Sequence, residues 1–427
     1  MFQTGFARAD VTPPLNTYLS GYYQARYAKD IVTPIELNAI AFSDGENKAV
    51  FITADFTGIK RVYCDEIREA ISKATGLQTE AIFIASLHQH TSISLVSFKA
   101  NNVMKDHAYL NLLYRKFSDV AVMALDDLAD TTLEISEKEL NEKIAFIRRY
   151  KLKDGSYKTN PYNVISEIEC PAEEPDNKVR LMRFKREGKK DIAFINFQTH
   201  ADVHGGELFC SDWPGFAREN VEKDNPDTYA ILACGFEGDS NHINFMGEIR
   251  RGPEQSRRMG RVIADAVRDL WNKGKEEKVS KISSNVNIVY NRTNMKGIEH
   301  YDECKALYRE FPGDTTKTTK SGISYPEAGR IIGLVEGATV CQRIPVSVIK
   351  LGDVIFAGLG GEAFVNYGAN LRRLFPDRFI FTSCCMNGYE GYLPTKSAFD
   401  HPTYEVVTSP FTETVEEDCL TKFKEMI

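Results

Sequence analysis

The stretch AIFIASLHQHTS, residues 81–92, joins a short apolar run to a group of polar side chains, and this pattern recurs along the chain. The run at residues 81–85 is short and apolar, which is typical of a buried strand. Further runs of this kind are residues 37–42, 49–54, 192–197, 229–234, 354–357 and 379–383. Segments with helical periodicity follow many of them, namely residues 62–75, 109–128, 214–222, 254–271 and 362–374. Strands that alternate with helices predict an α/β fold with mixed β-sheets flanked by helices.

The organisation of the chain favours a single large catalytic domain over residues 1–427. Polar stretches at residues 151–159, 172–177, 273–281 and 312–322 are predicted to be surface loops. None of them has the length or the low complexity of an interdomain linker, and no internal repeat is found.

Composition excludes several classes of function. The net charge is -7 and no block of Lys and Arg stands out, so nucleic acid is not an expected partner. No apolar run has the length of a membrane span, so no stable membrane insertion is expected. The start, MFQTGFARAD, lacks the features of a signal peptide, and the nine cysteines include no CxxC pair. We therefore expect a cytoplasmic protein with reduced cysteines.

The polar residues that follow the predicted strands are candidates for chemistry, because open α/β sheets bind ligands at the carboxyl ends of their strands. His88 and His90 follow the first run, and residues two apart in an extended segment point to the same side. The pair either enters one pocket or consists of two structural histidines. His200 follows the run at residues 192–197 in the same way.

Three more strand ends carry polar groups. GFEGDSNH, residues 235–242, is either part of a site or a turn with a capping Asp. Glu362 follows residues 354–357, and its carboxylate could cap its own helix or act as a metal ligand. Tyr389 and Tyr392 follow residues 379–383, where tyrosines serve more often in packing than as ligands. Two histidines and a glutamate from separate strand ends are typical of a catalytic zinc site, which keeps a position for water.

Taken in order, these segments resemble the catalytic N-terminal domain of the neutral/alkaline non-lysosomal ceramidase family. The resemblance runs from residue 5 to the C-terminus. It rests on GFARADVTPP (5–14), GY (21–22), AD (54–55), SLHQHTS (86–92), NFQTH (196–200), GDSN (238–241), GGEAF (360–364) and GYEGYLPT (388–395).

The resemblance implies a bound Zn²⁺ with four protein ligands, which are His88, His200, Glu362 and Tyr392. Tyr392 is preferred to Tyr389 because the family has a second functional tyrosine twelve residues later, before a glutamate, and Tyr404 precedes Glu405 here. The resemblance also makes His90 a residue that contacts substrate or water. It makes Arg148 a substrate-binding residue and matches Asn160 and Pro161 to the NP that follows this arginine.

The sequence departs from the family pattern at several positions. Asn241 stands where the family has a serine, with Ser240 one position early, and His242 stands where the family has a proline. An amide side chain cannot be activated as a nucleophile, so we expect direct attack by water. The sequence ends soon after SPF (409–411), so no C-terminal immunoglobulin-like domain is expected. These departures favour a substrate smaller or more polar than ceramide.

The sequence therefore predicts a zinc-dependent hydrolase that cleaves an amide (N-acyl) bond of a small-molecule or lipid substrate with metal-activated water. His90 is expected to orient or deprotonate the water, and Tyr404 with Arg148 to stabilise the oxyanion. One alternative is a zinc hydrolase of a small non-lipid N-acyl compound or an ester. The other is a metal-containing binding protein without catalysis.

Overall fold

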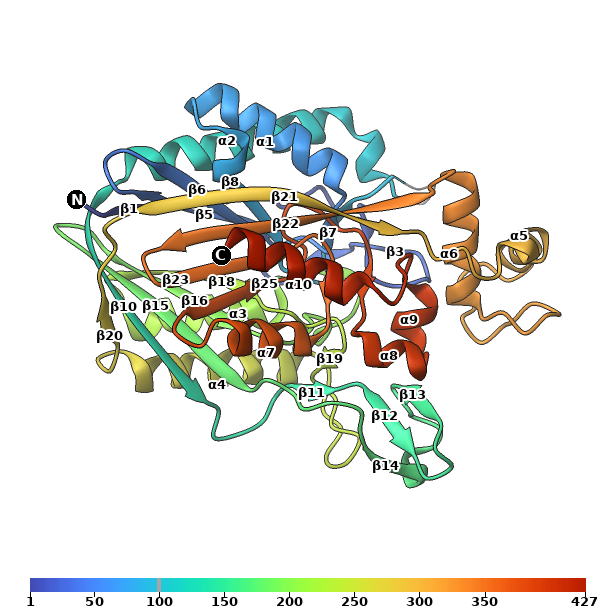
Figure 1. Ribbon diagram of the computed structural model, residues 1–427. Coiled ribbons are helices and arrows are strands. Elements are labelled where there is room, and N and C mark those ends of the chain that lie inside the picture. The colour runs from blue at the N-terminus through green and yellow to red at the C-terminus, as the bar shows by residue number, and fades with distance from the viewer. Residues whose placement is uncertain (98–100) are drawn as a thin grey trace.

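Two mixed β-sheets, stacked face to face, form the centre of the computed structural model, which describes residues 1–97 and 101–427 (Figure 1). The larger sheet has nine strands. Across the sheet these are β18 (Thr228–Cys234), β16 (Asp191–Phe197), β15 (Lys178–Arg186), β10 (Ala129–Glu139), β1 (Gln3–Asp10), β5 (Glu36–Ser43), β6 (Lys48–Ala54) and β8 (Ile82–Ser86), with β20 (Lys275–Glu277) beside β10. The smaller sheet contains β21 (Ile282–Arg292), β22 (Cys341–Leu351), β23 (Val354–Leu359) and β25 (Phe379–Ser383).

The space between the sheets is filled by apolar side chains, with aromatic rings at its centre. Phe194 of the larger sheet lies 5.4 Å from Phe51 and 5.1 Å from Phe356 of the smaller sheet, measured between ring centroids. These rings are almost fully buried. Burial of one such ring stabilises a fold by about 1.5–3 kcal/mol, so this layer holds the two sheets together.

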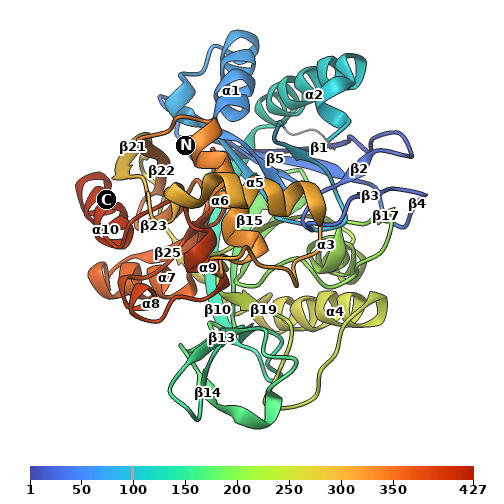
Figure 2. The ribbon, with the colours of Figure 1, turned by 90° about the vertical axis from the view of Figure 1, so that its right-hand side faces the viewer.

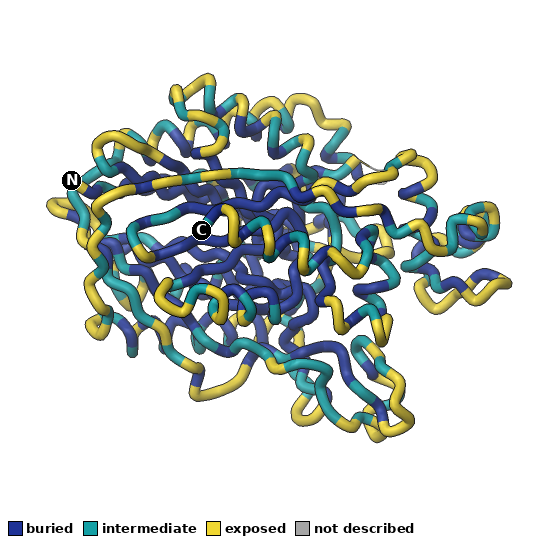
Figure 3. Tube along the Cα trace, viewed as in Figure 1, coloured by how far each residue is buried: buried dark blue, intermediate teal, exposed yellow. Residues whose placement is uncertain are grey.

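Helices cover the outer faces of both sheets (Figures 1 and 3). On the larger sheet these are α1 (Arg61–Thr75), α2 (His107–Asp126), α3 (Asp212–Asp224) and α4 (Pro253–Leu270). On the smaller sheet they are α7 (Val365–Leu374) and α10 (Val415–Met426). The predicted fold class, α/β with mixed sheets flanked by helices, is confirmed. None of the helices that the described residues form is long and apolar enough to cross a membrane.

The predicted strands are all present, but some other sequence predictions were wrong. The helix expected from residue 362 begins at Val365, because Glu362 belongs to the short strand β24 (Glu362–Ala363), which pairs with β26 (Tyr392–Leu393). Glu362 therefore does not cap this helix, and Asp239 accepts the Val365 N–H at 2.9 Å instead.

Two predicted loops also contain strands. Residues 151–159 include parts of β12 (Arg149–Leu152) and β13 (Tyr157–Thr159), which form a small sheet with β14 (Ile168–Pro171). Residues 273–281 include β20. Their charged side chains led to a loop prediction, although charged residues also occur on strands that have one face in solvent.

The loops that follow the parallel strands lie at one end of the two sheets. The parallel pairs β6–β8, β16–β18 and β23–β25 all have their carboxyl ends there. A helical hairpin of α5 (Tyr301–Glu310) and α6 (Tyr325–Glu336) projects beyond this end, and Figure 2 shows it in front of the sheets. The predicted loop at residues 312–322 joins these two helices.

Candidate active site

Three buried side chains from separate strand ends meet at this end of the sheets. His88 follows β8, His200 follows β16, and Glu362 follows β23. His88 Nε2 and His200 Nε2 lie 3.3 Å and 3.0 Å from Glu362 Oε2. His90 adds a third ring, with its Nε2 at 3.3 Å from His88 Nε2. The predicted convergence of these strand ends is therefore present.

The backbone around the cluster is shaped to bring these groups close. His88 has a φ of 56°, in the left-handed region that non-glycine residues seldom adopt, and such strain often marks functional positions. Gly238 lies against the main chain of Glu362, and a Cβ atom there would come within 2.3 Å of the Glu362 carbonyl oxygen. A side chain at position 238 would therefore displace Glu362.

The hydrogen bonds of the two histidines fix which ring nitrogens face the centre. His88 Nδ1 lies 2.7 Å from the Thr57 carbonyl oxygen, and His200 Nδ1 lies 2.9 Å from the carbonyl oxygens of Glu237 and Ser240. A carbonyl only accepts, so each Nδ1 carries a proton, and in the neutral ring each Nε2 presents a lone pair. Two lone pairs and a carboxylate oxygen then face each other at 3.0–3.3 Å, which is repulsive unless a proton or a cation lies between them.

Electrostatics within the cluster are strongly coupled. Burial disfavours charge on His88, but the Glu362 carboxylate outweighs it and raises the pKa of His88. Burial and the Arg148 charge lower the pKa of His200 to about 4. Burial opposes ionisation of Glu362, yet His88 and His200 hold the pKa of this carboxyl well below its usual range. The centre thus contains an ionised carboxylate and a neutral His200, which are the forms that bind metals.

This group of side chains fits a metal ion. Ligand atoms of His88, His90 and His200 all lie within 4.8 Å of one another, and each residue is buried. Imidazole nitrogen and carboxylate oxygen are donors that suit zinc. The carbonyl partners at each Nδ1 are the outer contacts that orient histidine ligands.

His90 is the most accessible member of the cluster and lies beneath a loop. Its Nδ1 has no hydrogen-bond partner among the described residues, and it is 3.6 Å from Asp202 Oδ1. Tyr22 packs edge-on against the ring and donates its hydroxyl to Asp202. Gly21 has a φ of 104°, and a Cβ atom there would lie 2.6 Å from the His90 ring. The loop after β2 (Tyr18–Leu19) therefore covers the site only because residue 21 is glycine.

Arg148 reaches the centre from the opposite side and is held rigidly. Its Nε donates to Glu405 at 2.7 Å and its Nη2 to the Gly238 carbonyl at 2.8 Å. The remaining Nη1 lies 3.4 Å from His200 Nε2. The guanidinium lies 6.0 Å from the centre of the Tyr404 ring, and the Tyr404 hydroxyl lies 3.4 Å from that of Tyr23. The structure thus brings Arg148 and Tyr404 close together, and their role at an oxyanion stays a prediction.

Two tyrosines approach Glu362, and they do so differently. Tyr392 is the register partner of Glu362 in the β24–β26 pair, and its ring centre lies 5.4 Å from the Arg148 guanidinium. Tyr389 donates its hydroxyl to Glu362 Oε1 at 3.0 Å. The choice of Tyr392 as a ligand stays a prediction, and Tyr389 is a contact of the cluster that sequence reasoning assigned no role.

Asn241 and Ser240 are engaged in structural hydrogen bonds. The Asn241 amide donates to Asn160 Oδ1 at 3.0 Å and accepts the Ile243 N–H at 3.0 Å. The Ser240 hydroxyl donates to the Gln198 carbonyl at 3.3 Å. Both side chains shape the loop that carries the carbonyl partner of His200.

Glu237 is a further buried acid that the sequence did not single out as a functional group. Neither carboxyl oxygen has a hydrogen-bond partner in the described part of the chain. Burial, reinforced by the charge of Glu362, raises its pKa well above the usual range and thus favours the protonated form. The only sequence feature that pointed to Glu237 was its place in GFEGDSNH, directly after a predicted strand.

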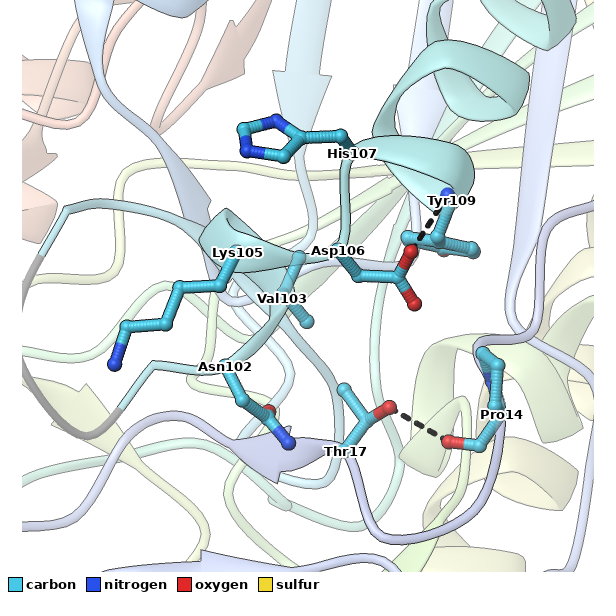
Figure 4. A pocket seen from close by; sticks show the side chains of 8 residues that line it. All are labelled: Pro14, Thr17, Asn102, Val103, Lys105, Asp106, His107 and Tyr109. Atoms are coloured by element: carbon cyan, nitrogen blue, oxygen red, sulfur yellow. Dashed lines mark hydrogen bonds between the residues drawn. The ribbon is translucent and has the colours of Figure 1, made fainter.

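A cavity of about 290 Å³ adjoins the cluster. Thr57 and Tyr389, which both contact the cluster, lie in its wall, and the lining also includes Tyr22, Tyr23 and Val96. A second cavity of about 390 Å³ lies at the start of α2, where Asp106 accepts the Tyr109 N–H (Figure 4). Neither Thr57 nor Tyr389 lines this second cavity, so the tyrosine-lined one is the candidate substrate pocket.

The fold and the cluster together define a two-sheet α/β protein with a candidate metal centre at the carboxyl ends of its strands. Among solved structures, the fold is similar to neutral ceramidase from Pseudomonas aeruginosa, with a TM-score of 0.74 and 15% identity over 100% of this chain and 74% of that chain. It is also similar to a ceramidase complexed with C2, with a TM-score of 0.74, 14% identity and the same coverage. The predicted resemblance to the neutral ceramidases is confirmed at the level of the fold. No protein-family model and no curated protein matches the sequence.

Proposed function

We propose that this protein is a zinc-dependent hydrolase that cleaves the amide bond of an N-acyl compound in a ceramidase-like reaction. The observation that carries the proposal is the convergence of two histidine lone pairs and a carboxylate oxygen at 3.0–3.3 Å, with both Nδ1 protons engaged elsewhere. His88, His200 and Glu362 would hold the metal, and the resemblance adds Tyr392 as fourth ligand. Zinc in such a site supplies Lewis acidity, which lowers the pKa of water to roughly 7.

His90 is placed to handle the proton of the attacking water. Its Nε2 faces the cluster, while its Nδ1 faces Asp202. Burial and the neighbouring His88 and His200 lower its pKa well below the usual value, which favours the neutral ring but weakens it as a base. The Asp202 carboxylate then lies close enough to favour the charged ring.

Arg148 and Tyr404 are placed to stabilise the negative oxygen that develops on the substrate carbonyl. Arg148 is fixed through Nε and Nη2, which leaves Nη1 directed toward the centre. A donor held in place before the reaction needs no reorganisation, and this is the condition for strong transition-state stabilisation. Glu405 balances the buried charge of Arg148.

Catalysis by direct attack of water accords with the contacts of the neighbouring loop. Ser240 is bound to a main-chain carbonyl, and Asn241 is bound to Asn160 and to the turn that follows it. Neither side chain is hydrogen-bonded to a base that could make it a nucleophile in the described structure.

An N-acyl amide is the favoured substrate class because the neighbouring fold is that of ceramidases, and the tyrosine-lined cavity offers room for an acyl group. The test is hydrolysis of matched N-acyl amides and esters by the purified protein, with metal analysis of the same sample. We expect about one zinc per chain, as for a single catalytic site, and turnover of the amide.

His88→Ala should abolish both metal and turnover, whereas His107→Ala, at an exposed histidine that begins α2, should change neither. Hydrolysis of esters alone would redirect the proposal to an esterase. Bound zinc without turnover of any substrate would leave a metal-containing binding protein.

A further inference from the structure

His242 is buried next to the active site without a partner. The residue is 5% exposed, and neither of its ring nitrogens has a hydrogen bond in the described part of the chain. A neutral imidazole has one donor and one acceptor, and a buried polar group that lacks a partner is costly. Such a group in a native structure calls for a ligand or a bound water.

The position of His242 relative to the centre follows from the short strand before it. Ser240, in β19 (Ser240–Asn241), accepts the His200 Nδ1 hydrogen through its carbonyl oxygen at 2.9 Å. The same strand pairs with β11 (Phe146–Ile147), which leads directly to Arg148. His242 follows this strand directly. It lies two residues, roughly 7 Å along the chain, from Ser240, whose carbonyl binds His200.

Arg251 is a cation on the same side of the site. Its guanidinium lies 5.3 Å from the centre of the Tyr162 ring, and it forms no ion pair with any carboxylate of the described chain. The following residue, Gly252, donates its N–H to the Val203 carbonyl at 2.9 Å, which places this loop beside the segment after His200. By contrast, the adjacent Arg250 pairs with Glu248 and Glu142.

Further contacts tie these loops together. Asn160 accepts the Asn241 amide at 3.0 Å, and the next aromatic residue, Tyr162, packs edge-on against Phe245 at 4.7 Å. The segment from Asn160 to Tyr162 thus bridges the His242 loop and Arg251. The nearby Asp202 carboxylate is engaged by the Tyr22 hydroxyl.

We propose that His242 and Arg251 form a subsite for an anionic oxygen group, a carboxylate or a phosphate, on the substrate of the active site. An arginine fork binds such groups through two parallel N–H donors, and an imidazole N–H can supply a third. The inference rests on the proposed amide hydrolysis and narrows its substrate class to acidic N-acyl compounds. Histidine in place of the proline of the resembled family is consistent with a substrate unlike ceramide.

The experiment compares three substrates that share one acyl group: an N-acylglycine, an N-acyl phosphoethanolamine and the neutral N-acylglycinamide. We expect kcat/KM for at least one anionic substrate to exceed that for the neutral one by about tenfold or more, as expected for one charge-assisted contact. The better anionic substrate identifies the group as carboxylate or phosphate.

Arg251→Gln and His242→Leu should each lower this anionic preference about tenfold, mainly through KM. Arg250→Gln is the matched control, because this neighbour is paired with glutamates, and it should keep the preference. Arg251 is exposed, so its variant tests the subsite even if a change at buried His242 affects folding. A preference for the neutral substrate, or an anionic preference that survives both variants, would overturn the inference.

Absence of turnover with all three substrates would instead count against amide hydrolysis. In that case the dissociation constants of N-acylglycine and N-acyl phosphoethanolamine still decide the subsite. Tighter binding than the neutral amide, lost in Arg251→Gln, would support it. Equal binding of all three, or no binding, would refute it.

Discussion

Two buried polar clusters lie close together at the carboxyl ends of the strands, and they differ in how their charges are satisfied. In the first, Asp55 and Arg218 form a two-pronged ion pair with N–O distances of 2.9 Å and 2.7 Å. The amide of Gln89 donates to the same carboxylate at 3.2 Å. Every charge in this cluster therefore meets a fixed opposite charge or hydrogen bond.

In the second cluster, Nε2 of His88 and of His200 faces the Glu362 carboxylate, and neutral rings bring no proton to either contact. The two clusters share one loop, because alternation along residues 88–90 directs both histidines to the centre and Gln89 toward Asp55. Burial is common to both clusters. The unsatisfied charge distinguishes a candidate metal centre from a structural ion pair.

The largest expected effect is loss of the second cluster. Changing both His88 and His200 to Ala removes two of the proposed ligands, so metal content should fall from about one per chain to near zero and activity should fall roughly 10⁴-fold or more. Metal analysis and kcat/KM on the same preparations measure this. Stoichiometric metal in the double variant would contradict the assignment.

A substitution in the Asp55–Arg218 cluster should lower stability rather than metal content. Asp55→Ala leaves the buried Arg218 with only its 3.3 Å contact to Glu36, and we expect a loss of about 3 kcal/mol in the free energy of unfolding. Urea denaturation measures this loss. The control is Asp224→Ala at the partly exposed pair with Arg261, which should cost less than about 1 kcal/mol. Equal losses in the two variants would show that the buried Asp55–Arg218 pair stabilises the fold no more than a partly exposed pair does.

Removal of metal should affect only the second cluster. A metal present at a hundredfold excess over its Kd stabilises the fold by about 2.7 kcal/mol, so a chelator should lower the Tm and added zinc should restore it. The double histidine variant should show no such response. A chelator-sensitive Tm in that variant would place the metal elsewhere.

A smaller effect is expected from the oxyanion donors. Tyr404→Phe removes one hydroxyl and keeps the ring, so kcat should fall about 100-fold while metal content stays unchanged. Steady-state kinetics beside metal analysis separates the two quantities. Loss of metal in this variant would show that Tyr404 supports the centre itself.

The smallest effect is predicted for Ser240. Ser240→Ala removes a hydroxyl that is bound to the Gln198 carbonyl, so kcat/KM should change by no more than about threefold, the scale of one neutral hydrogen bond. Mass spectrometry of the enzyme during turnover should detect no acyl adduct. An acyl group found on Ser240 would overturn direct water attack.

Local sequence patterns were sufficient to predict the fold class and the main candidate side chains. Short apolar runs mark buried strands because burial on both faces removes the polar alternation, and this local signal placed His88, His200 and Glu362 at strand ends. The same signal did not predict β10, because alternating charged residues occur where one face of a strand contacts solvent. It also failed for the start of α7, because the capping group, Asp239, lies 126 residues away in the chain.

The contacts among those side chains depend on long-range packing. The Thr57 carbonyl, which sets the tautomer of His88, and the hydroxyl of Tyr389, which binds Glu362, come from segments with no local sequence link to their partners. The same holds for Arg148, whose position depends on Glu405, 257 residues later. Local patterns report whether a residue is buried. The direction of a lone pair and the partner of a charge depend on long-range contacts, which only the packed sheets and loops supply.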